Sequence, residues 1–126
     1  MKIRHLELPS PFAVAPMAGM TDTAFRRLVK RHGGCGLVVT EMVSSEGLVR
    51  GIDRTLEYAE YTEEERPISI QIFGGDPEKM AAAAAIVEQL GADIVDVNMD
   101  LHWPDRWERD GRPQRGQARC PQSRSG

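Results

Sequence analysis

A strand-helix-strand unit constrains the fold of this chain more than any other feature of its sequence. Residues 68–73 alternate between isoleucine and other side chains with a period of two, which predicts a β-strand. Asp76 follows as a helix cap, with Pro77 at the first helical position and Gly91 as the stop. A second apolar run, 94–98, predicts another strand. Because the connections are short, we expect two parallel strands with the helix covering one face of their sheet.

The first 40 residues show the same rhythm. Strands are predicted at 12–15 and 37–39 from their short apolar runs. The helix between them starts at Thr21 or Asp22 and ends at Gly33-Gly34, since glycine is the preferred residue just after a helix.

Four strands separated by helices predict an α/β fold. A short helix is expected at 44–50, whereas the glutamate-rich segment 53–66 has no pattern that assigns it to an element. Both a doubly wound sheet and a (β/α)8 barrel begin in this way. The chain has neither a G-x-G-x-x-G nor a Walker-type loop, so the usual phosphate motifs of doubly wound sheets are missing.

Each of the two longer predicted helices is expected to bury one apolar face. These faces consist of Phe25, Leu28 and Val29 in the first helix, and of Met80, Ala83, Ala84, Val87 and Leu90 in the helix after Asp76.

Polar side chains lie near the carboxyl ends of the last two predicted strands. Gln71 alternates with Ile70 and Ile72, and Asp96 and Asn98 alternate with valines. In a barrel the isoleucines would pack under helices and Gln71 would point inward, where barrel enzymes place their chemistry. A carboxamide offers both a donor and an acceptor to the edge of a heterocycle. The alternative is that Gln71 and Asn98 only satisfy buried backbone groups.

Five motifs in order give residues 10–99 a resemblance to a known family. They are Ala15-Pro16-Met17-Ala18-Gly19-Met20-Thr21-Asp22, Phe25-Arg26, Thr40-Glu41-Met42-Val43-Ser44, Gln71-Ile72-Phe73-Gly74 with Asp76-Pro77, and Asp96-Val97-Asn98-Met99. With these motifs the chain resembles the opening of the tRNA-dihydrouridine synthases. The Asn98-Met99 ending and the Ala-Pro-Met-Ala-Gly loop favour this family over flavin barrels similar to dihydroorotate dehydrogenase.

The resemblance implies a partial (β/α)8 TIM barrel, about the first four strands of an FMN-binding domain, over residues 1–99. Such enzymes use NADPH to reduce FMN, and the flavin reduces uridine to dihydrouridine in tRNA. By the same resemblance Pro16, Met17 and Ala18 lie against the flavin, Gln71 hydrogen-bonds the isoalloxazine edge, and Asn98 lies near the target uridine. Core packing is the alternative for Met17. Glu41 is either a structural hydrogen-bond acceptor or a site residue.

The resemblance stops after Met99. The family continues with Gly-Cys-Pro, whose cysteine supplies the proton, but this chain continues with Asp100 and Leu101. No catalytic residue is therefore assigned. Cys120 lies in a segment without a strand pattern, and His102 is expected to be a solvated side chain. The family's later flavin-phosphate loops and its helical RNA-binding domain are absent from the sequence as well.

Residues 100–126 differ in composition from the rest. They hold six arginines and four acidic residues, against ten basic and fifteen acidic residues in 1–99, within a chain of net charge −3. We expect either a frameshift after Met99, which the neighbouring reading frame would reveal as a Gly-Cys-Pro continuation, or a genuine disordered tail. In both cases we expect a truncated, inactive chain. The alternatives are a fragment of another FMN-dependent barrel and a non-catalytic remnant.

Composition excludes further classes of protein. No apolar run reaches the roughly 18 residues of a membrane span, and the first 20 residues contain no secretory hydrophobic region. Cys35 and Cys120 match no zinc spacing, so no metal is expected. We therefore expect a cytoplasmic protein. Because a half barrel leaves its first and fourth strands as open edges, we also expect self-association or aggregation and little flavin binding.

Overall fold

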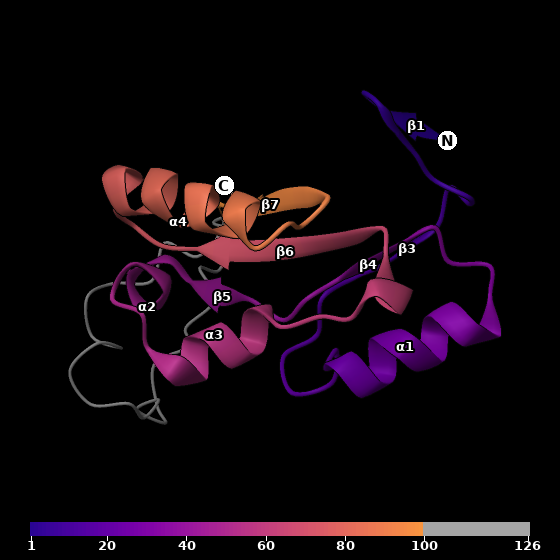
Figure 1. The fold of residues 1–126 in the computed structure, drawn as a ribbon, viewed down its shortest axis with the longest axis horizontal. Helices are drawn as coiled ribbons and strands as arrows, with labels where there is room; N and C mark the ends of the chain where they lie inside the picture. The colour runs from indigo at the N-terminus through magenta and orange to yellow at the C-terminus, as the bar shows by residue number, and fades with distance from the viewer. Residues whose placement is uncertain (100–126) are drawn as a thin grey trace, which may run out of the picture.

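The computed structural model describes residues 1–99, which form a parallel sheet with helices packed on it (Figure 1). The strands of this sheet are β3 (Ala13–Val14), β4 (Leu37–Val39), β5 (Val43–Ser44), β6 (Ile68–Phe73) and β7 (Ile94–Asn98). The helices are α1 (Thr23–His32), α2 (Ser45–Val49), α3 (Asp53–Ala59), η1 (Glu63–Glu65, a single 3-10 turn) and α4 (Pro77–Gln89).

The order of the strands in the sheet decides between the two predicted architectures. β3 pairs with β4, β4 and β5 both pair with β6, and β6 pairs with β7, always in parallel. Neighbours in the chain are therefore neighbours in the sheet, whereas a doubly wound sheet reverses its strand order at a switch point. The predicted partial (β/α)8 barrel is confirmed. Within residues 1–99 it is not closed, since β3 and β7 are each paired on one side only.

β4 and β5 are two parts of one strand that a bulge interrupts. Val38 pairs with Ile68, and Val43 pairs with Ile72. Five steps along this strand thus oppose four steps along β6, which places one extra residue within 40–42. A bulge bends its strand and redirects side chains, and this one occurs beside the predicted site residues.

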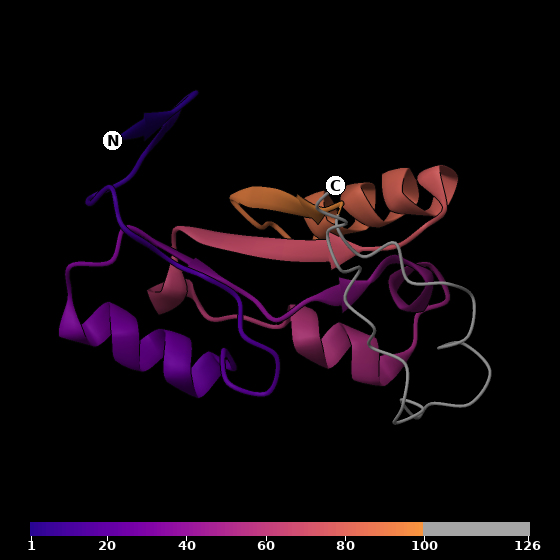
Figure 2. The same cartoon turned by 180° about the vertical axis from the view of Figure 1, so that it is seen from behind.

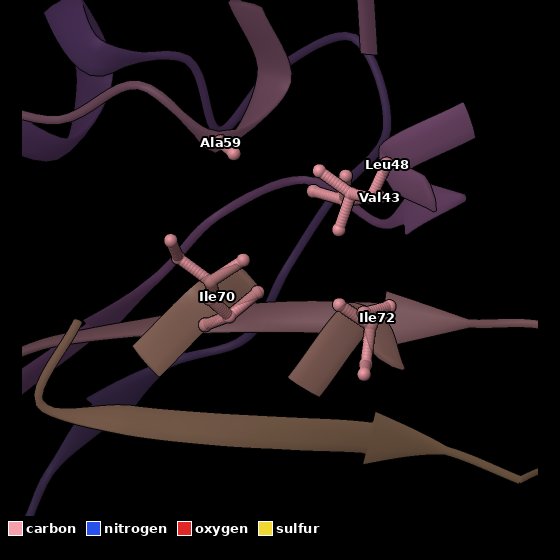
Figure 3. Packing of buried hydrophobic residues seen from close by; sticks show 7 residues of the cluster. Val43, Leu48, Ala59, Ile70 and Ile72 are labelled. Atoms are coloured by element: carbon pink, nitrogen blue, oxygen red, sulfur yellow. The ribbon is translucent and has the colours of Figure 1, made fainter. Parts of the chain in front are cut away.

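The outer face of β6 carries the core. Ile70 and Ile72 are fully buried, as expected from the period-two pattern, and Figure 3 shows them on β6 beneath side chains from the neighbouring elements. The other buried members of this cluster are Val43 from β5, Leu48 from α2, Ala59 from α3, and Ala83 and Val87 from α4. One strand thus joins three helices into a single apolar layer.

Two predicted apolar faces need correction. Leu28 is 66% exposed, and the residue of α1 that is buried is Arg26, whose guanidinium finds hydrogen-bond partners in η1 and the preceding loop. Leu90 is 42% exposed, because it follows the last residue of α4 as its C-cap. The rest of the α4 face is confirmed, since Ala83 and Val87 are fully buried and the partly buried Met80 and Ala84 pack against them.

The predicted helix ends are confirmed, and Asp22 rather than Thr21 caps α1. The unassigned segment 53–66 contains α3 and η1. The sequence did not predict β5, or the antiparallel hairpin of β1 (Lys2–Ile3) and β2 (Leu6–Glu7), because two-residue strands are too short to show a period. Both views show the start of the chain standing away from the sheet (Figures 1 and 2). None of the helices in residues 1–99 has the length and apolarity that crossing a membrane requires.

Candidate functional site

The predicted site residues lie on the inner face and at the carboxyl ends of the strands. Gln71 is directly opposite Asp96 in the β6–β7 register, and Asn98 is opposite Phe73. These side chains therefore share the face opposite to the buried isoleucines. The loop 15–22, which contains Pro16, Met17 and Ala18, follows β3 at the same end of the sheet.

Gln71 presents an unused acceptor to this inner face. Gln71 is 7% exposed, and its Nε2 donates a hydrogen bond of 2.5 Å to Oδ2 of Asp96. Because a carboxylate can only accept, this bond fixes the orientation of the amide. The other amide atom, Oε1, is buried without a hydrogen-bond partner, as is Oγ of Ser69 two residues earlier. The site thus offers a carbonyl oxygen that suits a ligand with an N–H group.

Asn98 lies two residues closer than Asp96 to the carboxyl end of β7. Its Nδ2 contacts Sδ of Met42, at 3.3 Å, so the bulged strand reaches across the inner face to it. Asn98 is half-buried, and the neighbouring Met99 is 84% exposed. The polar end of Asn98 is therefore held at the rim of the sheet.

The loop after β3 is held by polar groups of its own and by Glu41. The hydroxyl of Thr21 accepts from the N–H of Met17 and donates to its carbonyl, both at 3.1 Å. Gly19 takes a left-handed φ of +74°, and its N–H donates to Oε2 of Glu41 at 2.7 Å. Met17 and Ala18 are exposed and Pro16 is half-buried. Met17 is 39% exposed, so it does not pack in the core, which was the alternative for this residue.

A buried ion pair between Arg26 and Glu65 stabilises this loop. Nε of Arg26 donates to Oε1 of Glu65 at 2.6 Å, and Nη1 donates to the carbonyl of Thr21, also at 2.6 Å. Glu65 also accepts from the backbone N–H of Thr62 and from the hydroxyl of Thr23. Burial raises the pKa of Glu65, but these hydrogen bonds to its ionised form outweigh burial and hold the pKa below its usual value.

Some sequence predictions lie outside the described residues. These are His102, Cys120, the departure from Gly-Cys-Pro and the basic tail. Within residues 1–99, no group of three or more His, Cys, Asp or Glu side chains is arranged to hold a metal ion.

Comparison with known proteins decides the family. The family model described as "Dihydrouridine synthase (Dus)" matches residues 13–100, which include all five motifs. The chain belongs to the dihydrouridine synthase family. This family, whose members are oxidoreductases, was the one indicated by the motifs, and the match selects it over barrels similar to dihydroorotate dehydrogenase.

Curated relatives agree with the family assignment. The chain is 44% identical over 99 residues to "tRNA-dihydrouridine synthase B" of Shewanella oneidensis, covering 79% of this chain and 30% of the relative. It is 46% identical over 101 residues to the "Probable tRNA-dihydrouridine synthase" of Rhodobacter capsulatus, covering 79% and 31%. The corresponding protein of Aquifex aeolicus is 44% identical over 93 residues, covering 72% and 28%. The chain thus spans about 30% of the length of these dihydrouridine synthases.

The structure adds residues to which the sequence assigned no role in the site. Asp96 orients Gln71, Thr40 accepts from the backbone N–H of Gln71, and Thr21 closes the loop after β3. The Gln71–Asp96 pairing could have been found by aligning the two strands in register, since both residues were placed on the polar face. The Arg26–Glu65 pair spans 39 residues, and no local pattern indicates it.

Proposed function

We propose that residues 1–99 form the first part of an FMN site in an oxidoreductase that reduces uridine to dihydrouridine in tRNA, with NADPH as reductant. The observation that carries this proposal is the buried, unpartnered Oε1 of Gln71 on the inner face, at the barrel end where enzymes of this fold act. The family match and the names of the relatives supply the substrate class.

The donors and acceptors of the site fit a flavin ring. The edge of the isoalloxazine ring carries an N–H group, from which Oε1 of Gln71 can accept a hydrogen bond. The bond from Nε2 of Gln71 to Asp96 fixes the orientation of the amide. Met17 and Ala18 offer an exposed, mostly apolar surface on which a planar ring can lie. FMN held by Gln71 and the loop after β3 would supply hydride transfer between NADPH and the substrate.

The side chains of this chain then have distinct roles. Gln71 orients the cofactor, and the loop of Pro16, Met17 and Ala18 shields one side of it from water. Asn98 lies nearer to the rim than Gln71, where it can hydrogen-bond the base of a nucleotide. We propose that this chain alone is inactive, since no residue is assigned as the proton donor. The proposal includes the cytoplasmic location expected from the sequence.

A chimera tests the proposal without requiring activity from the isolated chain. Residues 1–99 replace the equivalent segment of the Shewanella oneidensis relative, with which the chain shares 44% identity. The chimera is expressed in a strain without its own dihydrouridine synthases. We expect flavin absorbance in the purified protein and dihydrouridine in the tRNA, measured by mass spectrometry of its nucleosides.

Variants of the chimera separate the parts of the proposal. Gln71→Leu should weaken FMN binding by about tenfold, because one buried hydrogen bond to the ring is lost. Asn98→Ala should lower tRNA reduction while FMN stays bound. A folded chimera without flavin contradicts the FMN site, and one that holds flavin but leaves tRNA unmodified contradicts the substrate.

A further inference from the structure

We infer that Glu41 is a positioning residue that couples the two parts of the proposed cofactor site, the loop after β3 and Gln71. The inference rests on the proposed function only in that these parts serve FMN. The link itself is a chain of hydrogen bonds through Thr40 and Glu41 in the bulge between β4 and β5.

The first half of the link fixes the bulge to β6. Thr40 is fully buried, and its Oγ1 accepts from the backbone N–H of Gln71 at 3.2 Å. The same hydroxyl donates to the carbonyl of Glu41 at 2.9 Å, and the N–H of Thr40 donates to the carbonyl of Ser69. The backbone of Glu41 is therefore held in a defined relation to Gln71, on the strand that bears the unused acceptor.

The second half of the link fixes the loop to the bulge. Oε2 of Glu41 accepts from the N–H of Gly19 at 2.7 Å, a short, charge-assisted bond. Gly19 directly follows Ala18 and takes a left-handed φ, and its bond to Glu41 anchors the loop in which Met17 and Ala18 are exposed. Because the bulge supplies one extra residue, the strand can place Thr40 against β6 and still direct Glu41 to the loop.

Three substitutions in the full chain separate hydrogen bonding from charge. Glu41→Gln keeps an acceptor of the same length without the charge, Glu41→Asp keeps the charge but is one methylene shorter, and Glu41→Leu keeps neither. Hydrogen-deuterium exchange, followed by mass spectrometry, reports on the peptide that contains Gly19. Exchange at this amide should be at least about tenfold faster in Glu41→Asp and Glu41→Leu, and faster by a smaller factor in Glu41→Gln, which keeps the acceptor but loses the charge.

The readout distinguishes a local role from general destabilisation. Exchange in β6 should stay unchanged in Glu41→Asp, while the loop alone loses protection. If Glu41→Leu does not fold, the comparison of Glu41→Gln with Glu41→Asp still decides. Wild-type protection of the loop in Glu41→Asp, or a loss in Glu41→Gln as large as that in Glu41→Asp, would overturn the inference. A chimera that binds no flavin would instead contradict the proposed function. It would not affect the exchange rates predicted for the Glu41 variants, so the two failures can be told apart.

Discussion

At the scale of single residues, the inner face depends on a few polar side chains whose partners fix their orientation. Gln71 is held by the carboxylate of Asp96, so that one amide atom is satisfied and the other faces the interior unpaired. A buried polar atom without a partner carries a free-energy cost, and a site that binds a ligand regains that energy when the ligand supplies the missing group. In the proposed FMN site, the same atom that lowers stability would thus provide affinity.

Replacing Asp96 should show how far Gln71 depends on it. Asp96→Ala leaves Nε2 of Gln71 without an acceptor and should lower the free energy of unfolding by about 1–3 kcal/mol. Asp96→Asn retains a carbonyl acceptor and should lower the free energy of unfolding clearly less than Asp96→Ala does. Urea denaturation of the two variants measures the difference, and equal losses would show that the hydrogen bond does not matter.

The Arg26–Glu65 pair should be far more sensitive than the surface ion pairs. Both side chains are buried, so Glu65→Gln leaves an uncompensated charge and should cost about 3–5 kcal/mol in unfolding free energy. Arg31→Ala, which removes an exposed partner of Glu64, serves as the control and should change stability little. A loss in Glu65→Gln no larger than that of the control contradicts the role assigned to the pair.

The stability of the wild type should also depend on pH through Glu65. Its pKa is lowered in the folded state, so its contribution is fully present above the unfolded value of about 4.3 and is lost as the pH falls through the folded pKa. The free energy of unfolding should therefore fall less steeply with decreasing pH in Glu65→Gln than in the wild type. Parallel pH profiles for the two proteins would exclude this contribution.

At the scale of elements, the connections between helices and strands determine where the strand ends lie. Gly36 joins α1 to β4, and its N–H donates to the carbonyl of Phe12. A Cβ atom at this position would collide with the backbone carbonyl of Ser10. The close approach of these two segments sets the start of both β3 and β4, and so the position of the loop that follows β3.

Two glycine substitutions should therefore differ in effect. Gly36→Ala should lower the free energy of unfolding by about 1–3 kcal/mol, because backbone atoms of Ser10 have to shift. Gly75→Ala is the matched control between β6 and α4, where an added Cβ meets no atom within 4 Å and φ is not left-handed. It should be neutral or stabilise the chain by up to about 1 kcal/mol. Thermal unfolding of both variants provides the comparison.

At the scale of the whole molecule, the described sheet has two open edges. β3 and β7 each lack one neighbour within residues 1–99, and Val97 on the outer face of β7 is 45% exposed. Unpaired strand edges beside apolar side chains are sites of association with other chains.

Self-association therefore remains our prediction for the isolated chain, together with little flavin binding. Sedimentation velocity over a range of concentrations should show species larger than a 14.0 kDa monomer. A double substitution with lysine, Val97→Lys on β7 and Ala13→Lys on β3, should reduce association if the edges are responsible. A yellow, monomeric and soluble wild-type protein would contradict both expectations.

The sequence by itself determined the elements that have a strong local signal. The period-two pattern of 68–73, the Asp76-Pro77 start and the Gly33 stop are consequences of backbone geometry and capping, which act over a few residues. The motifs between Ala15 and Met99 also indicated the family, which the family model confirms over residues 13–100. Leu28, in contrast, was wrongly placed in the core, because the burial of Arg26 depends on a glutamate 39 residues away.

Only the tertiary structure decided the strand order and the connections within the candidate site. A parallel sheet of either architecture can be built from the same local patterns, and pairing between distant strands selects one of them. The bulge that brings Glu41 to Gly19 likewise exists only in the register of β4 and β5 against β6. Local sequence specifies which residues form strands, whereas register, and with it the meeting of side chains, is a property of strands packed together.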